Sequence, residues 1–152
     1  MQSEPVVILV EDDDQAIQDV VMDALSEGGF EAAVTQSGEE AVTLLQGASA
    51  NYRALITDIN LLGRFDGWEV AKRARQISPD IPVIYMTGAA AVDWASRGVP
   101  NSLLLQKPLA PAQIVRRSLR CSMQHRQLLR IECRAPPANF THCSILTKSS
   151  AG

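Results

Sequence analysis

VVILVEDDDQAI, residues 6–17, joins five consecutive apolar residues to four consecutive acids. The apolar run is short and mostly β-branched, which favours a strand buried on both faces of a parallel sheet. Residues 14–27 follow with apolar side chains at helical spacing, and Gly28 and Gly29 end that pattern. The stretch therefore predicts a buried strand, a charged strand end and a helix.

The same order of strand and helix recurs along the chain. Further strands are predicted at 31–35, 54–57, 82–86 and 102–106. Helices are predicted from Ser37, which forms a capping box with Glu40, to Leu45, over 68–77, briefly around 90–97, and from about Pro111. This alternation predicts an α/β fold, with a doubly wound parallel sheet of five strands and helices on both faces.

Composition narrows the class of protein. A chain of 152 residues with 46% hydrophobic and 20% charged residues suits one globular domain. No apolar run is long enough to cross a membrane, and the N-terminus lacks the basic region of a signal peptide, so we expect a cytoplasmic protein. The three cysteines are odd in number and lack metal-like spacing, which predicts free thiols.

Charge is divided unevenly along the chain. Residues 1–109 carry 7 basic and 16 acidic residues, a net of −9, whereas residues 110–152 carry 7 basic and 1 acidic residue, a net of +6. Nucleic-acid contact is one interpretation of the basic part. A solvated helix face that docks on the acidic part is the interpretation we favour.

Polar residues stand just past four of the predicted strands. In a doubly wound sheet the functional crevice lies beyond the carboxyl ends of the strands. The residues at those ends are Glu11, Asp12, Asp13, Asp58, Thr87 and Lys107. Taken singly, each has an ordinary structural explanation, such as an acid near a helix N-terminus or an Asp in a turn. Four such coincidences at one edge favour a site.

The chemistry of this set points to phosphoryl transfer. Two carboxylates ~4 Å apart repel each other by ~4 kcal/mol at an effective dielectric near 20, so a cluster of acids calls for a cation or a proton. Hard oxygen ligands suit Mg²⁺. Lys107 and Thr87 could hold a phosphoryl group, and Asp58 is a candidate carboxylate nucleophile.

With these residues in place, the sequence resembles the receiver domain of two-component response regulators. The matching segments are ILVEDD (8–13), ITDIN (56–60), DGWEVA (66–71), PVIYMTG (82–88) and QKP (106–108). The resemblance covers about residues 5–120. It implies a flavodoxin-like strand order 2-1-3-4-5, and we assign residues 5–128 to the receiver and 129–152 to a basic, flexible tail.

The resemblance also implies a role for each site residue. Asp58 would accept a phosphoryl group from a histidine kinase or a histidine phosphotransfer protein. Glu11, Asp12 and Asp58 would bind Mg²⁺ together with the backbone carbonyl of Asn60, Glu11 acting through water. Phosphoryl binding would fall to Thr87 and Lys107, and Pro108 is the candidate for a cis peptide bond.

Two departures from the family pattern affect this site. The loop INLLGRFDG, residues 59–67, lacks the usual proline and is one residue longer before Asp-Gly. Leu104 stands where the family usually has an aromatic switch residue, three positions before the lysine. The switch at this position is therefore atypical.

We expect a single-domain receiver that switches partner binding and is not an enzyme beyond its own Mg²⁺-dependent phosphorylation and dephosphorylation. No DNA-binding domain is expected, and a homodimer is left open. One alternative is a degenerate receiver that binds a partner without phosphorylation. A Mg²⁺-dependent phosphohydrolase is another, although such enzymes need an Asp where this chain has Asn60.

Overall fold

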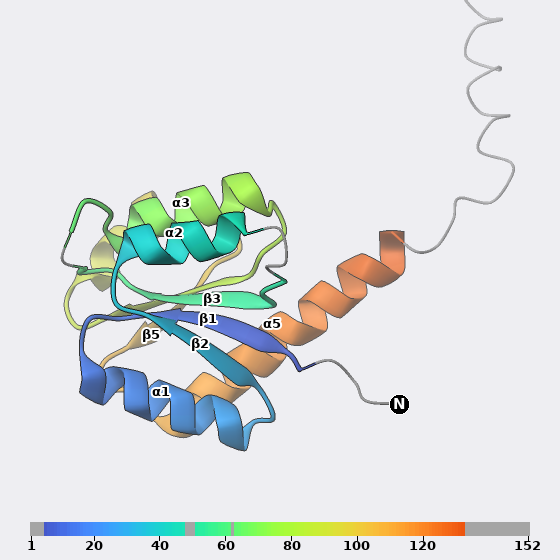
Figure 1. Ribbon diagram of the computed structural model, residues 1–152, viewed down its shortest axis with the longest axis horizontal. Coiled ribbons are helices and arrows are strands. Elements are labelled where there is room, and N and C mark those ends of the chain that lie inside the picture. The colour runs from blue at the N-terminus through green and yellow to red at the C-terminus, as the bar shows by residue number, and fades with distance from the viewer. Residues whose placement is uncertain (1–4, 48–50, 62, 133–152) are drawn as a thin grey trace, which may run out of the picture.

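A five-stranded parallel sheet lies at the centre of the protein (Figure 1). The structure, a computed structural model, describes residues 5–47, 51–61 and 63–132. Its strands are β1 (Val7–Glu11), β2 (Glu31–Thr35), β3 (Ala54–Asp58), β4 (Val83–Thr87) and β5 (Leu103–Gln106). Their order is β2-β1-β3-β4-β5, and every neighbouring pair is parallel, which confirms the predicted fold.

Helices cover both faces of the sheet. They are α1 (Gln15–Glu27), α2 (Gly38–Gln46), α3 (Gly67–Ile77), α4 (Trp94–Arg97), which follows the 3₁₀-helix η1 (Ala90–Asp93), and α5 (Pro111–Glu132). Figure 1 shows α2 and α3 over one face and α1 and α5 over the other. In the described chain, no helix combines the length and the apolar character that a membrane crossing needs.

Alternation along the strands produces two apolar cores, because successive side chains of a strand point to opposite faces. Ile56 and Ile84 pack with α1 and α5, and this core also holds Cys121. Leu55 and Tyr85 pack on the other face, with residues of α2 and α3. Both cores share the central strands, so the carboxyl ends of those strands are held by packing on two sides.

Polar side chains set the starts of three helices. The Asp14 carboxylate accepts a hydrogen bond from the Ala16 N–H and caps α1. One half of the predicted capping box is present at α2, where the Ser37 hydroxyl accepts from the N–H of Glu40; the Glu40 carboxylate accepts from the N–H of Gln36 and not from that of Ser37. Asp66 caps α3 by accepting from the Glu69 N–H. Each cap satisfies a backbone donor that a helix leaves unpaired, and so fixes where the helix begins.

The ends of three strands differ from the sequence-based expectation. Strands β1, β3 and β4 end at Glu11, Asp58 and Thr87, each one residue later than predicted, because the sheet register still pairs Glu11 with Thr57, Asp58 with Met86 and Thr87 with Gln106. Helix α5, which was predicted to begin near Pro111 and was given no end, spans Pro111–Glu132, and no Gly or Pro interrupts it after its first residue. The rest of the expected tail, residues 133–152, lies outside the described residues.

Candidate functional site

The carboxyl ends of four strands bring the candidate residues to one edge of the sheet. Asp58 is the last residue of β3 and Thr87 the last of β4, while Asp12 and Lys107 directly follow β1 and β5. Parallel pairing aligns these ends, as the register of Asp58 with Met86 and of Thr87 with Gln106 shows. The sheet itself therefore positions the site.

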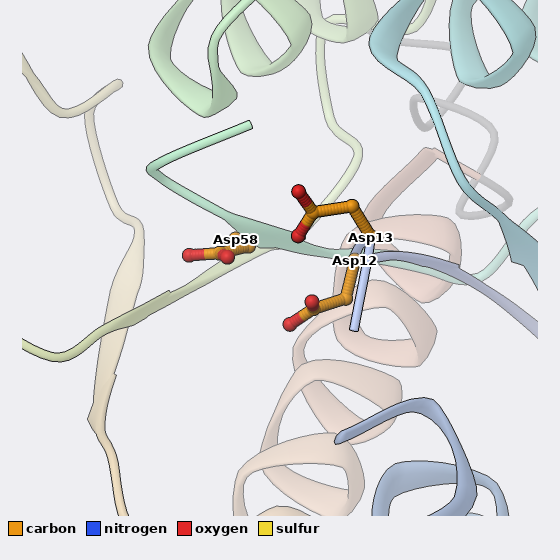
Figure 2. A group of neighbouring side chains, drawn as sticks. All are labelled: Asp12, Asp13 and Asp58. Carbon is orange, nitrogen blue, oxygen red and sulfur yellow. The ribbon is translucent and has the colours of Figure 1, made fainter. Parts of the chain in front are cut away.

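Three aspartates converge at this edge. Carboxylate oxygens of Asp12, Asp13 and Asp58 lie within 4.8 Å of one another, and Figure 2 shows the three side chains at the ends of β1 and β3. One oxygen of Asp12 accepts from the Asp14 N–H at 2.8 Å, and one of Asp58 accepts from the Asn60 N–H at 3.3 Å. These bonds orient two of the carboxylates and leave further oxygens facing the cluster.

Lys107 supplies a positive charge to the same cluster. Its Nζ donates to Asp58 Oδ2 at 3.1 Å and to Asp12 Oδ2 at 3.2 Å. Partial burial alone would lower the pKa of the Lys107 ammonium, but the two carboxylates outweigh it and the pKa is raised. Burial also raises the pKa of Asp12, with the charge of Asp58 adding to it. The ammonium therefore stays charged and holds two like-charged groups together.

Glu11 is not part of the aspartate cluster. Its side chain is fully buried, Oε2 accepts a hydrogen bond from the Thr57 hydroxyl at 3.0 Å, and Oε1 has no hydrogen-bond partner among the described residues. Desolvation raises the pKa of this carboxyl to about 8. Because Glu11 belongs to β1, its side chain lies on the same face as that of its register partner Thr57. Its predicted contact with a metal through water stays a prediction.

Thr87 and Lys107 are joined through the backbone. The Lys107 N–H donates to the Thr87 carbonyl at 2.8 Å. The Thr87 side chain is buried, and its hydroxyl accepts from the Ala89 N–H at 3.2 Å. The Lys107–Pro108 peptide bond is cis, as the resemblance implies. The ends of β4 and β5 therefore form one connected unit beside the cluster.

Two contacts position the loop after Asp58, one at Arg64 within the loop and one at Gly67, where α3 begins. Glu39 of α2 accepts the Arg64 N–H at 2.9 Å, beside Gly63 with its φ of +128°. A Cβ placed on Gly67 would lie 2.1 Å from the carbonyl oxygen of Asp58, so only glycine allows α3 to start this close to β3. The predicted metal contact of the Asn60 carbonyl stays a prediction.

Leu104 lies beside an aromatic residue of the neighbouring strand. Leu104 pairs in register with Tyr85, and both pack in the core that faces α2 and α3. Tyr85 is fully buried; its ring centroid lies 4.9 Å from that of Trp68, and its hydroxyl accepts from the Val99 N–H at 3.1 Å. The aromatic ring in this row therefore comes from β4 and is held by a hydrogen bond.

The donor set fits a small divalent cation. Three carboxylates offer hard oxygen atoms of the kind that Mg²⁺ prefers. Asp13 was not among the predicted ligands, although it belongs to the acidic run that opened the analysis. The signal in the sequence that could have identified it is its position directly after Glu11 and Asp12 in the acidic run.

Known proteins share this arrangement of sequence and fold. The family model described as the response regulator receiver domain matches residues 7–118. Response regulator MprA of Mycolicibacterium vanbaalenii is 32% identical over 115 residues, which are 74% of this chain and 48% of that protein. MprA of Mycobacterium avium is 30% identical over 112 residues, or 72% of this chain and 48% of that protein. The chain thus spans about half the length of these relatives.

Solved structures agree with this assignment. A response regulator receiver protein from Sinorhizobium medicae is 36% identical, with a TM-score of 0.74 over 78% of this chain and 95% of that one. A receiver domain protein from Clostridium thermocellum, at 21% identity, shares the fold with a TM-score of 0.73 over 81% of this chain and 98% of that one. The chain belongs to the response regulator receiver domain family.

Proposed function

We propose that the chain accepts a phosphoryl group on Asp58 from a histidine kinase or a histidine phosphotransfer protein, and that this modification switches the binding of a downstream partner. The single observation that carries the proposal is the position of Lys107 Nζ, 3.1 Å from Asp58 Oδ2 and 3.2 Å from Asp12 Oδ2, at the edge where three aspartates meet. A cation, a cluster of metal-binding oxygens and a nucleophilic carboxylate are what phosphoryl transfer to a carboxylate needs.

Asp12, Asp58 and the Asn60 carbonyl would hold Mg²⁺, with Glu11 contributing through water and Asp13 as a further carboxylate of the cluster. When bound, Mg²⁺ would offset the charge on the phosphoryl oxygens. An Asp58 oxygen attacks the phosphorus of a phosphohistidine, a P–O bond forms and the P–N bond breaks. The imidazole leaves with the electron pair and takes up a proton.

The switch would use the connected ends of β4 and β5. Phosphorylation converts the Asp58 carboxylate into a group with more charge and more acceptor oxygens. The Lys107 ammonium then moves from Asp58 Oδ2 to a phosphoryl oxygen. The Thr87 hydroxyl, which accepts from the Ala89 N–H in the unphosphorylated chain, donates to a second phosphoryl oxygen. Because the Lys107 N–H is bonded to the Thr87 carbonyl, the two changes are coupled.

Hydrolysis of the aspartyl-phosphate by water would return the protein to its resting state, so the chemistry is self-limited and the chain is not an enzyme acting on other molecules. We further propose that it acts in the cytoplasm as a stand-alone receiver, with residues 5–128 as its working unit. Because the curated relatives are about twice as long as the matched segment, the stand-alone role is a separate proposal from the phosphorylation of Asp58.

Incubation with acetyl phosphate and Mg²⁺, followed by intact mass measurement, tests the proposal. We expect one phosphoryl adduct on the wild type and none on Asp58→Asn or in EDTA. Asp80→Asn, an exposed acid at the opposite end of the sheet, is the matched control and should still form the adduct.

A folded protein without an adduct under any condition would instead identify a degenerate receiver that binds a partner without phosphorylation. Release of phosphate over many turnovers from several phosphoesters would identify a phosphohydrolase.

A further inference from the structure

One polar residue of α1 is buried on the side of the helix that faces the core. The buried residues of this helix are Gln18, Val21, Ala24 and Leu25, which recur at helical spacing. Gln18 is 3% exposed and is the only one of the four with a polar side chain. A buried amide costs free energy unless its polar atoms form hydrogen bonds, so we looked for its partner.

The partner of Gln18 is the backbone beside the aspartate cluster. Its side-chain nitrogen, Nε2, donates to the carbonyl oxygen of Asp12 in a buried hydrogen bond. A helical side chain leans toward the N-terminus of its helix, which brings that of Gln18 back over the turn before α1. The backbone N–H of Gln18 donates to the Asp14 carbonyl at 3.0 Å. Gln18 therefore holds the turn of residues 12–14 through two of its carbonyl groups.

The Asp12 carbonyl belongs to the peptide group that joins Asp12 to Asp13. Because a peptide group is planar, a hydrogen bond to its oxygen restricts both ψ of Asp12 and φ of Asp13. These two dihedral angles set the separation of the two carboxylates, which Figure 2 shows beside Asp58. The Asp12 side chain is fixed separately, since its Oδ1 accepts from the Asp14 N–H at 2.8 Å. One hydrogen bond from α1 thus orients two adjacent aspartates.

We propose that Gln18 is a positioning residue for the metal site. It fixes the peptide group between Asp12 and Asp13 so that their carboxylate oxygens meet those of Asp58 within 4.8 Å. Removal of a group that orients metal-binding residues commonly weakens metal binding about ten- to hundredfold. The inference rests on the proposed magnesium site, and Gln18 itself would not touch the metal ion.

An uncharged donor suits this position better than the alternatives. A Lys or Arg at residue 18 could donate to the Asp12 carbonyl, but it would add a second cation to a cluster that already contains the Lys107 ammonium. That charge would oppose the binding of a divalent cation. An apolar side chain would leave the buried carbonyl without this hydrogen bond. Glutamine supplies the donor and leaves the charge of the cluster unchanged.

Gln18→Met in the full chain tests the proposal, because it keeps the length of the side chain and removes the donor. Titration with magnesium chloride, followed by NMR through the amide signals of Asp14 and Asn60, measures the dissociation constant. We expect binding about tenfold weaker than in the wild type. Gln18→Asn, whose amide is one methylene shorter, should weaken binding in the same direction. The matched control is Gln15→Met, which removes an exposed hydrogen bond to Asp19 on the same helix and should bind Mg²⁺ like the wild type.

A measurement in EDTA separates positioning from a general loss of stability. The Asp14 N–H donates to Asp12 and the Asn60 N–H donates to Asp58, so the two amides report on different sides of the cluster. In Gln18→Met, exchange of the Asp14 amide with water should become about tenfold faster, because the turn loses a hydrogen bond. Exchange of the Asn60 amide should stay as in the wild type.

Three results would overturn the proposal: unchanged Mg²⁺ binding by a folded Gln18→Met, equal acceleration of exchange at both amides, or failure of both Gln18 variants to fold, which would assign the side chain to stability. If the wild type forms the Asp58 adduct and Gln18→Met binds Mg²⁺ normally, the positioning role alone is rejected. A wild type that binds no Mg²⁺ rejects the proposed metal site, and the positioning role with it.

Discussion

Glu11 is a fully buried carboxyl group whose pKa is raised well above its ordinary value. Only the Thr57 hydroxyl contacts it by a hydrogen bond at 3.0 Å, and its other oxygen has no partner among the described residues. Its pKa of about 8 means that the folded protein holds a proton on Glu11 at a pH where the unfolded chain, at its usual 4.5, has released it. Folding is thereby linked to proton binding.

The sign of that linkage gives a testable pH profile. The contribution of Glu11 to the free energy of unfolding is complete below about pH 4.5 and is lost as the pH rises to about 8. In EDTA, Glu11→Gln should therefore gain stability relative to the wild type over this window, by up to about 1.4 kcal/mol per pH unit. Urea unfolding at a series of pH values measures the difference.

The exposed strand residue Glu31 offers a matched control, and Glu31→Gln should run parallel to the wild type across the window. Parallel profiles for Glu11→Gln and the wild type would contradict the assignment of a raised pKa to this residue.

Most residues of the candidate site could be predicted from the sequence alone. Asp12, Asp58, Thr87 and Lys107 were singled out because each follows a predicted buried strand, and the structure places them at one edge. The orientation of Glu11 was not predictable, because it depends on β1 extending one residue further than its apolar run. The proximity of Asp13 depends on the turn after β1, which a run of consecutive acids does not specify.

At the scale of elements, the junction between β3 and α3 is the tightest connection near the site. The Gly67 N–H donates to the Ile59 carbonyl at 3.1 Å, and the position of its missing side chain is 2.1 Å from the Asp58 carbonyl oxygen. Any side chain at residue 67 must push the helix away from the strand. The geometry of Asp58 therefore depends on this glycine.

Gly67→Ala should lower the free energy of unfolding by about 3 kcal/mol, because the added methyl group meets backbone that cannot move independently. Chemical denaturation followed by circular dichroism measures the loss. Gly88→Ala is the control, since a Cβ there meets nothing within 4 Å, and it should change stability by less than about 1 kcal/mol. Similar losses at both positions would refute the steric argument.

The ends of helices could be predicted where capping residues or glycines mark them in the sequence. The capping box at Ser37 and the paired glycines after Glu27 set helix ends that the structure reproduces within a residue. The start of α5 at Pro111 was predicted, but its end at Glu132 was not, because no Gly or Pro lies between Pro111 and Glu132 to give a stop signal.

At the scale of the whole molecule, the two cores are parts of one structure. The strands β1, β3 and β4 each give alternate side chains to both, so neither core can be lost while the sheet remains. Trp68 lies in one core and Cys121 in the other. Burial raises the pKa of the Cys121 thiol to about 11, which keeps it unreactive in the folded state.

We expect the two cores to unfold together. In a protein with Trp94→Phe, Cys133→Ser and Cys143→Ser, Trp68 fluorescence reports one core and brief thiol labelling of Cys121 reports the other. Both signals should give the same urea midpoint, as a two-state transition requires. Labelling of Cys121 at a lower urea concentration than the fluorescence change would show that α5 separates first.

The fold class followed from the sequence because five apolar runs alternate with amphipathic segments, and few topologies accommodate that order. The strand order itself came from the resemblance, since periodicity does not say which strands are neighbours. The register and the two-sided packing confirm it independently.

The meeting of Asp12, Asp13, Asp58 and Lys107 also has an electrostatic consequence at long range. Three carboxylates and one ammonium leave a local charge of −3 + 1 = −2, which is the charge that one divalent cation neutralises. Without such a cation, this end of the sheet repels any anionic phosphodonor before contact. We therefore expect the divalent cation to bind before the phosphodonor. The rate of encounter with the phosphodonor should then rise with the concentration of the cation.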